Sequence, residues 1–337
     1  MFRHLFFSVI FLPITLVGHT QPKRFTFSQP KMGAPFNIIF YFTDSLQANT
    51  IATQCYQLVD SLVMIYSDYI DSSELNRLCA KAGKPNNSVI VSPALFDILW
   101  ISKTAYEKSE GTFDITLGPL TKLWRKARKE KIFPGDNAVK EKLSLTGLKK
   151  IRIDTTTHEV QLLQPGMQLD LGGIAQGYIA QRVIDFLKTK NIFNALVDVS
   201  GDIVAIGSPP NTNGWTVGVN APGKTDELQK RNLLINNKAV TTSGDVYQYM
   251  EHDGKRYSHI VDPRTGYGIT SQKNVTVIAN DGTTADWLTK ACSILPTRKA
   301  KKLAHSLQAE VLIAEIKKGN PVFHATKGFE RYWKSKL

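Results

Sequence analysis

A pair of adjacent glycines constrains the fold of this chain more than any other feature. Gly172 and Gly173 lie within the segment LDLGGIAQGY, which runs from residue 169 to residue 178. Apolar residues flank Asp170, and from Ile174 onward apolar residues recur with a helical period, so the pattern predicts a turn from a strand into a helix. Backbone N–H groups at such a turn can face a phosphate. The glycine spacing is neither G-x-G-x-x-G nor G-x-x-x-x-G-K-[ST], so it supports neither a Rossmann nor a P-loop nucleotide site.

The rest of the chain combines helical and strand patterns. A strand is expected from Phe25 to Phe42, and a helix from Gln47 to Tyr66. Ser92 followed by Pro93 is typical of another helix start. In the second half, short alternating runs such as NALVDVSGDIVAIG suggest an antiparallel sheet. We therefore expect an α+β fold with mixed or antiparallel sheets flanked by helices, built as one compact unit or as two interleaved subdomains.

The first twenty residues are typical of an export signal. A short basic start at Arg3 is followed by an apolar run from Leu5 to Gly18 and then by polar residues. This run is too short to span a bilayer comfortably. We expect residues 1–20 to be a signal peptide and residues 21–337 to form a single domain. The mature protein is then exported, either soluble in the periplasm or attached to the outer face of the inner membrane.

The formal net charge of +13 has a strong local source. Residues 122–131, KLWRKARKEK, carry six cations against one Glu, and a solvated basic helix is the default interpretation. Aromatic side chains do not interleave with these cations as a base-stacking surface requires, and no nucleic-acid-binding motif occurs. We therefore expect no nucleic-acid partner. Attraction to an anionic membrane surface or to a phosphorylated ligand stays open.

The segment TADWLTK carries side chains that suit a metal ion. Asp286, Thr289 and Lys290 share one helix face at this spacing. One carboxylate, one hydroxyl and a backbone carbonyl from the Gly172–Gly173 turn would suffice for Mg²⁺, which leaves other coordination places to phosphate oxygens. Taken alone the signal is weak, because an Asp near a helix start is more often a cap.

His259 is the histidine placed most like a catalytic base. It lies in YSHIVDPRTG, with Asp262 three residues later, and this arrangement can offer a base near neutral pH. From the spacing alone, a structural histidine bonded to a loop carbonyl is the commoner explanation.

Six segments together resemble the ApbE family of FAD:protein FMN transferases: FDITLGPLTKLW, LDLGGIAQGY, NALVDVSGDI, AVTTSGD, YSHIVDPRTG and TADWLTKA. They occur in the family's order and at similar separations, and the resemblance covers most of the chain from about Phe25 to Pro296. It implies an ApbE-like fold and the Mg²⁺-dependent transfer of FMN from FAD to a Thr or Ser hydroxyl of a target flavoprotein, with release of AMP. The target would carry this hydroxyl within a segment of the type D-[GA]-x-x-[ST]-[GS]-A-T.

The resemblance also implies roles for single residues. It implies that His259 is the base that activates the acceptor hydroxyl. It implies a metal site formed by the carbonyl of Gly173 and the side chains of Asp286 and Thr289. The positions that match FAD contacts are Met32, Tyr69, Thr112, Phe113, Asp114, Asp170, Gln176 and Ile260. Several of these have plainer explanations, since Met32, Phe113 and Ile260 could be core residues and Tyr69 an interface ring.

Two positions depart from the family pattern. Lys290 stands where the family usually has a Thr, and a charged ammonium cannot ligate a metal. It could instead pair with Asp286 or touch a phosphate, and so supplement or weaken the metal site. Gln176 stands where the family often has a Lys or Glu. Alternatives to the transferase are an Mg²⁺-dependent FAD pyrophosphatase that yields FMN and AMP, a non-catalytic FAD-binding protein, and a basic surface protein that does not bind FAD.

Overall fold

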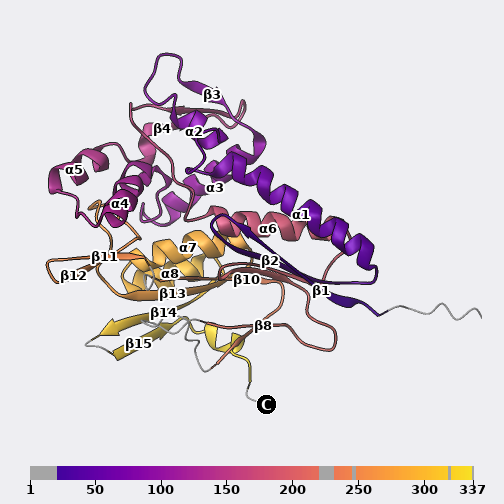
Figure 1. Cartoon of the computed structure of the whole chain (residues 1–337). Helices are drawn as coiled ribbons and strands as arrows, with labels where there is room; N and C mark the ends of the chain where they lie inside the picture. The colour runs from indigo at the N-terminus through magenta and orange to yellow at the C-terminus, as the bar shows by residue number, and fades with distance from the viewer. Residues whose placement is uncertain (1–20, 220–230, 245–247, 318–319, 336–337) are drawn as a thin grey trace, which may run out of the picture.

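An eight-stranded antiparallel sheet forms the base of the molecule (Figure 1). The computed structural model describes residues 21–219, 231–244, 248–317 and 320–335, so the expected signal peptide lies outside the described residues. In spatial order the strands are β1 (Lys23–Lys31), β2 (Ala34–Phe42), β6 (Ala195–Val199), β7 (Asp202–Ile206), β10 (Lys238–Ser243), β13 (Lys273–Ala279), β14 (Glu310–Lys317) and β15 (Asn320–Ala325).

Three smaller sheets and a set of helices complete the described structure. The small sheets pair β3 (Ser88–Ile90), β5 (Glu159–Leu162) and β4 (Ile151–Ile153); β8 (Trp215–Val217) and β9 (Leu233–Ile235); and β11 (Tyr249–His252) and β12 (Lys255–Ser258). The α-helices are α1 (Ser45–Tyr66), α2 (Glu74–Cys79), α3 (Pro93–Lys108), α4 (Gly118–Glu130), α5 (Asp136–Ser144), α6 (Ala175–Thr189), α7 (Gly282–Ile294) and α8 (Thr297–Ser306). Short 3₁₀ helices are η1 (Ile115–Leu117), η2 (Leu148–Lys150) and η3 (Phe329–Tyr332).

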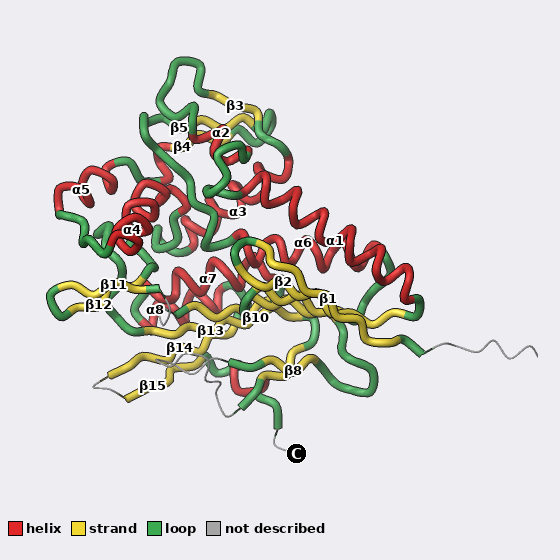
Figure 2. Tube along the Cα trace, in the orientation of Figure 1, coloured by secondary structure: helices red, strands yellow, loops and turns green. Residues whose placement is uncertain are grey.

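The two faces of the large sheet pack against different layers. Along β6, Ala195, Val197 and Val199 join the main core under the helices, whereas Leu196 joins a second core with β8, β9 and η3. Successive side chains of a strand point to opposite faces, so this alternation places helices on one face and the small β8–β9 sheet on the other (Figure 2). The expected α+β architecture of antiparallel sheets flanked by helices is confirmed.

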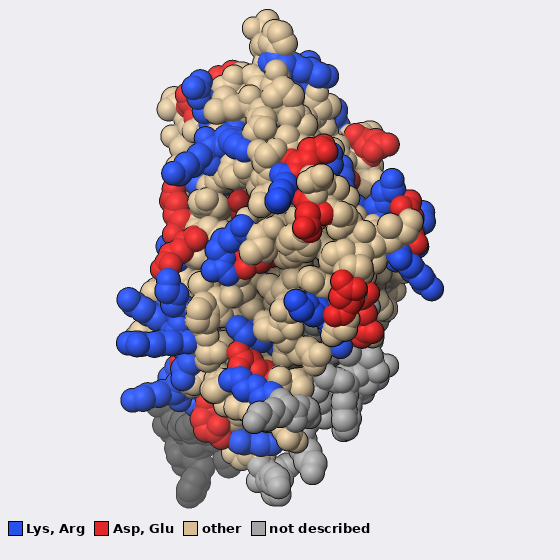
Figure 3. All heavy atoms as spheres, turned by 90° about the vertical axis from the view of Figure 1, so that its left-hand side faces the viewer, with Lys and Arg blue, Asp and Glu red and all other residues tan. Residues whose placement is uncertain are grey.

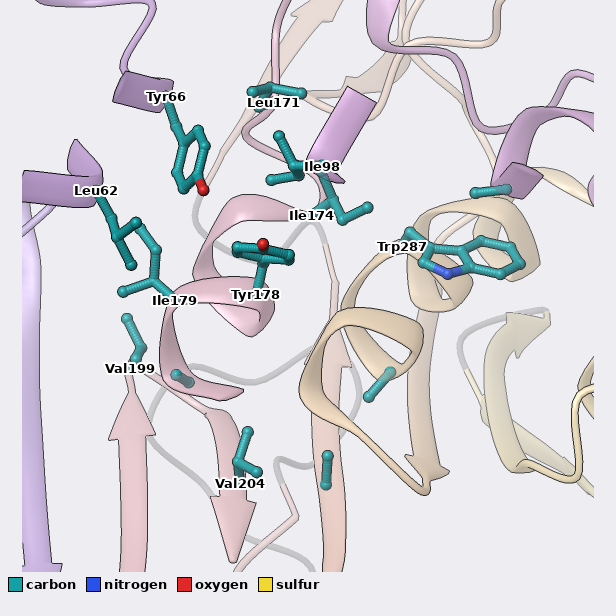
Figure 4. Close-up of a cluster of buried hydrophobic side chains, with 14 of the residues drawn as sticks. Leu62, Tyr66, Ile98, Leu171, Ile174, Tyr178, Ile179, Val199, Val204 and Trp287 are labelled. Atoms are coloured by element: carbon teal, nitrogen blue, oxygen red, sulfur yellow. The ribbon is translucent and has the colours of Figure 1, made fainter. Parts of the chain in front are cut away.

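The main core joins α1 and α6 to the sheet. Tyr66 at the end of α1 meets Tyr178 of α6 edge-on, with ring centroids 5.6 Å apart. Figure 4 shows both rings beside Ile174, with Val199 and Val204 reaching up from the sheet. The same buried cluster continues into α3 and into the small β3–β5–β4 sheet, which lies above the helices in Figure 1. Apolar packing therefore fixes the end of α1 and the start of α6 relative to the sheet.

Helices α6 and α7 approach unusually closely because a glycine of each lies at the contact. A Cβ atom added to Gly177 would lie 2.2 Å from the carbonyl oxygen of Gly282, and one added to Gly282 would lie 2.5 Å from that of Gly177. Such distances leave no room for a side chain at either position. The backbones themselves therefore set the spacing of the two helices that carry the expected metal site.

Two expectations about strands are wrong. The strand expected from Phe25 to Phe42 is a hairpin of β1 and β2, in which Met32 (φ 54°) and Gly33 (φ 74°) form the two-residue turn. Positive φ at both positions is the conformation that tight hairpin turns require. No strand precedes the glycine pair either: Leu169 and Leu171 are buried in a loop, so their apolar pattern reflects packing of an irregular segment. Within the described residues, no helix is long and apolar enough to cross a membrane.

Candidate functional site

A cavity of about 850 Å³ opens between the helical layer and the loops around α4. Its walls come from the β1–β2 turn, the segment after α1, the start of α4, the glycine pair before α6, the His259 segment and Lys290 of α7. Cavities of this size bury ligands as large as a cofactor. Segments far apart in the sequence therefore converge on one pocket.

Arg125 of α4 organises the wall nearest the glycine pair. Its guanidinium donates one hydrogen bond to Asp68 and another, 2.6 Å long, to Asp170. It also lies over the ring of Tyr69, 4.3 Å from the ring centroid, while Tyr69 itself is 75% exposed. Burial and the negative charge of Asp170 raise the pKa of Asp68, and Arg125 opposes that rise. One cation thus holds two acids together beside an aromatic ring that is free to stack on a ligand.

The expectation of a merely solvated basic helix at residues 122–131 is therefore wrong for its inner face. Trp124 is buried and its indole N–H donates to the carbonyl of Gly266, 2.8 Å away. Arg125 and Arg128 line the cavity, while Lys126 and Lys129 point outward. On the face seen in Figure 3, Lys and Arg are interspersed with Asp and Glu rather than merged into one basic surface. Arg125 and Arg128 are therefore the cations of this helix that can contact a ligand.

Backbone amides around the glycine pair donate hydrogen bonds to acceptors of the chain itself. The amide of Asp170 donates to the carbonyl of Ile115, and the amide of Gly172 donates to Oδ1 of Asp170, 2.7 Å away. The amide of Gly177 donates to Oδ2 of Asp286 at 3.0 Å. The amides of Gly172, at the turn, and of Gly177, in the first turns of α6, are thus already occupied by carboxylates of the chain.

The loop after α3 forms a second wall. Thr112 donates from its hydroxyl to the carbonyl of Ser109, and Phe113 is buried 6.0 Å from Trp287, centroid to centroid. Asp114 caps η1 by accepting from the amide and the hydroxyl of Thr116, at 2.8 and 2.6 Å. Burial raises the pKa of Asp114, and these two bonds counteract the rise.

His259 presents a defined tautomer to the cavity. Its backbone amide and its Nδ1 both contact the carbonyl oxygen of Gln248, at 2.9 and 3.2 Å. A carbonyl oxygen only accepts, so Nδ1 carries the hydrogen and Nε2 keeps its lone pair. Burial and then the positive charge of Lys290 lower the pKa of His259 to about 4. The ring is therefore a neutral proton acceptor at physiological pH.

Asp262, three residues after His259, pairs with an arginine and not with the imidazole. Asp262 accepts hydrogen bonds from Nε and the terminal nitrogen of Arg264, the latter 2.6 Å long. The carbonyl of Gln248, and not Asp262, orients the imidazole.

The expected metal ligands come together, but an ammonium lies between them. Asp286 is fully buried in the middle of α7, and its Oδ1 accepts from Nζ of Lys290 at 2.9 Å. The same Nζ is 3.2 Å from Oγ1 of Thr289, whose hydroxyl donates back to the carbonyl of Asp286 at 2.7 Å. No cluster of three or more His, Cys, Asp or Glu side chains suited to a metal occurs in the described part of the chain.

A second buried acid, Asp202 of β7, faces this group. Burial and the negative charge of Asp286 raise the pKa of Asp202, while Lys290 acts in the opposite direction. Burial by itself would lower the pKa of Lys290, yet Asp286 and Asp202 raise it above its ordinary value. Both acids therefore favour the charged form of Lys290, and Asp286 is in direct contact with it.

The family model for ApbE matches residues 32–313. The chain belongs to the ApbE family. An FAD:protein FMN transferase of Klebsiella pneumoniae is 33% identical over 287 residues, which cover 82% of this chain and 87% of that protein. One of Treponema pallidum is 33% identical over 261 residues, covering 73% and 72%.

Solved ApbE structures share the fold. The crystal structure of the ApbE protein from Thermotoga maritima has a TM-score of 0.82 and 27% identity, and the match covers 93% of this chain and 100% of that one. The apo form of the Pseudomonas stutzeri flavinyl transferase ApbE has a TM-score of 0.81 and 26% identity, with 95% and 100% covered. The expected ApbE-like fold is thus confirmed.

Most positions singled out by the ApbE resemblance face the same space. Ten of the twelve line the cavity, whereas Asp286 and Thr289 lie behind Lys290. The ten are Met32, Tyr69, Thr112, Phe113, Asp114, Asp170, Gly173, Gln176, His259 and Ile260.

Other residues of this ApbE site went unnoticed in the sequence. Asp68 and Arg125 are 57 positions apart, and Arg128 and Gln248 also line the cavity. The sequence did indicate the two arginines. Trp124 interrupts the basic run, and so large an apolar side chain predicts which face of the helix is buried. Gln248 acts only through its backbone carbonyl, which no residue pattern reveals.

Proposed function

We propose that this ApbE protein transfers FMN from FAD to a Thr or Ser hydroxyl of a target flavoprotein and releases AMP. One observation carries the proposal: the neutral Nε2 of His259 and three cations, Arg125, Arg128 and Lys290, line the same cavity. A proton acceptor beside concentrated positive charge suits attack of a hydroxyl on a phosphate. The curated relatives named FAD:protein FMN transferase support the assignment of substrate and product.

The proposed reaction is a single displacement at phosphorus. The acceptor oxygen forms a bond to the phosphorus of the FMN half, the bridging P–O bond to the AMP half breaks, and AMP leaves with the bridging oxygen. The hydroxyl proton passes to Nε2 of His259, because Nδ1 is already protonated on the Gln248 carbonyl. Cations that line the cavity stabilise the charge on the leaving phosphate.

The remaining walls suit the other parts of FAD. The exposed ring of Tyr69, backed by Arg125 at 4.3 Å, offers a face on which the flavin can stack. Asp114 and Asp170 supply carboxylate acceptors for ribityl, ribose or adenine donors. Phe113 and Ile260 add buried apolar surface that excludes water from the reacting bond.

Mg²⁺, which the family resemblance implies, does not fit the residues as they lie. Such an ion would be held by Gly173, Asp286 and Thr289, and when bound it would neutralise the pyrophosphate. Both carboxylate oxygens of Asp286 already accept hydrogen bonds, from Gly177 and from Lys290. The hydroxyl of Thr289 donates to the helix carbonyl of Asp286. The proposed steps therefore run through side chains of the chain itself.

The proposal includes the place of action and the partner. The apolar run after Arg3 supports export through a signal peptide, with the mature enzyme soluble in the periplasm or associated with the outer face of the inner membrane. Its partner would be a flavoprotein subunit whose Thr or Ser lies in the D-[GA]-x-x-[ST]-[GS]-A-T segment. Fractionation of cells that produce the tagged chain tests the location, and a cytoplasmic pool alone would contradict it.

Incubation of the purified protein with FAD and a peptide carrying that segment tests the activity. We expect a peptide mass increase equal to one FMN less water, together with an equal amount of AMP. Free FMN and AMP without a modified peptide would identify an FAD pyrophosphatase. Tight FAD binding without AMP would identify a binding protein, and no FAD binding would discard all three.

Two controls sharpen this experiment. A peptide with Ala in place of the acceptor Thr or Ser must stay unmodified. The variant His259→Gln should lose transfer while the matched control His305→Gln, an exposed histidine on α8, should retain it. Equal loss in both variants would remove His259 from the reaction.

A further inference from the structure

Lys290 carries a formal charge at the place where the family resemblance puts a metal ion. Its Nζ bridges Oδ1 of Asp286 at 2.9 Å and Oγ1 of Thr289 at 3.2 Å. An ammonium has three N–H groups, so these two contacts leave a third. Since Lys290 also lines the cavity, its third N–H is the one that can reach a ligand.

A divalent ion and this ammonium cannot share the site. Mg²⁺ binds oxygen at about 2.0–2.1 Å, so an ion ligated by Asp286 and Thr289 would overlap the position of Nζ. The two cations would also repel each other at close range inside a buried site. Binding of the metal would therefore require Lys290 to leave Asp286.

The surroundings hold the lysine side chain in place. A Cβ atom added to Gly173 would lie 3.2 Å from Cγ and 4.0 Å from Cε of Lys290, so the stem packs along the bare backbone of that glycine. The side chain of Lys290 is 22% exposed, and that of Asp286 is fully buried. Gly173 thus makes room for the stem of a lysine, independently of the ion pair at its end.

The charge of Lys290 is also paired without a metal. Its ammonium lies 2.9 Å from Oδ1 of Asp286, whose side chain is fully buried. Removing Lys290 would leave Asp286 without this cation, which is costly. A divalent ion placed beside an undisturbed Lys290 would add charge that Asp286 does not offset.

We infer that Lys290 is the resident cation of the pyrophosphate subsite, and that this chain binds and cleaves FAD without a divalent metal. The inference rests on the proposed function for the identity of the ligand. Its ammonium donates to a phosphate oxygen of FAD from the same position that pairs with Asp286. The chain then carries within its own sequence the charge that a bound ion would otherwise supply.

The test compares metal content, FAD affinity and transfer in the full chain after treatment with EDTA. For the wild type we expect no Mg²⁺, Mn²⁺ or Ca²⁺ by elemental analysis after dialysis. We expect FAD dissociation constants, followed by flavin fluorescence, within about twofold of each other in EDTA and in Mg²⁺. FMN transfer to the acceptor peptide should likewise persist in EDTA. Transfer lost in EDTA and restored by Mg²⁺, or stoichiometric metal in the dialysed protein, would overturn the inference while leaving the transferase activity established.

Substitution of Lys290 supplies the second arm. Lys290→Thr should gain a metal requirement, with FAD affinity in EDTA lower than in Mg²⁺ by roughly ten- to a hundredfold, the size of one charged hydrogen bond. Lys290→Met should lose affinity in both conditions, and Lys299→Thr, on exposed Lys299 of α8, should match the wild type. Circular dichroism confirms that each variant is folded. Unchanged FAD affinity in Lys290→Met would also overturn the inference, whereas metal-independent FAD binding without transfer would overturn only the proposed reaction.

Discussion

Lys290 and Asp286 lie one helical turn apart on α7, with Nζ 2.9 Å from Oδ1 and the carboxylate fully buried. Lys290 is the partly accessible member of the pair and lines the cavity. The ammonium that faces a ligand is thus also the partner of a buried acid. A change at either residue therefore affects both ligand binding and the stability of the fold.

Replacing Asp286 by Asn should destabilise the protein. The ammonium of Lys290 would lose its contacting carboxylate inside a largely buried site, and loss of one partner of such a pair costs about 3 kcal/mol. Urea denaturation measures this change in the free energy of unfolding. Asp185→Asn, at an exposed acid that pairs with Lys188, is the control and should change stability by less than about 0.5 kcal/mol. Equal effects of the two changes would contradict the prediction.

Replacing Arg125 by Met should destabilise the protein more at pH 8 than at pH 5. Without the cation, Asp68 and Asp170 face each other uncompensated, and the folded-state pKa of Asp68, which burial and Asp170 raise, loses the opposing effect of Arg125. A raised carboxyl pKa in the folded state makes stability fall as pH increases, because the unfolded chain ionises first. Denaturant midpoints at the two pH values measure the effect. Lys129→Met, at an outward residue of the same helix, should show no such pH dependence.

The rate of FMN transfer should be insensitive to pH from about 8 down to about 5 and should fall as pH passes through 4. His259 acts in its neutral form, and its pKa is lowered to about 4 by burial and by Lys290. Because the unfolded chain takes up this proton at the ordinary histidine pKa, about 6.5, His259 also lowers stability progressively between about pH 6.5 and 4. Initial rates over this range, with folding monitored in parallel, test the prediction. An acid limb near 6.5 would contradict it.

The same pH profile can separate the influence of Lys290 on His259. Removing the positive charge in Lys290→Met, which offers no ligand to a metal, should move the acid limb of the transfer rate to higher pH, since that charge lowers the pKa of His259. The measurement is made at saturating FAD in EDTA, so that no metal ion replaces the ammonium. A limb that does not move would show that Lys290 does not set the histidine pKa.

Replacing Gly177 by Ala should destabilise the protein by about 3 kcal/mol, at the upper end of the usual cost of overpacking. The new Cβ would lie 2.2 Å from the carbonyl oxygen of Gly282 and 2.7 Å from Cβ of Asp286, so α6 and α7 must separate. Thermal unfolding measures the loss. Gly135→Ala, where a Cβ meets nothing within 4 Å and φ is −66°, should be close to neutral. A neutral Gly177→Ala would mean that the helices can move apart freely.

The sequence predicted those parts of the fold that local patterns specify. The helix that begins after Gly173, the helix that carries Asp286 and the cap at Ser92 all follow from apolar periodicity and terminal residues. The turn at Met32 escaped prediction because a non-glycine residue there adopts positive φ. The apolar residues Leu169 and Leu171 suggested a strand because burial in a loop leaves the same pattern as burial in a sheet.

The site was predictable as a set of positions and not as a set of contacts. The motif order anticipated that His259 and Asp170 face one cavity. The bond from Arg125 to Asp170 crosses 45 positions, and the bond of His259 to Gln248 uses a backbone carbonyl. Such pairings depend on how α4 and the β11–β12 hairpin pack, which is tertiary information that spacing does not contain.

The backbone contact between Gly177 and Gly282 bears on what a substitution at position 290 can change. Because no side chain contributes to that contact, the spacing of α6 and α7 around Asp286 is independent of the residue at position 290. A substitution at position 290 alone can then change the charge and chemistry of the site without redesigning the scaffold.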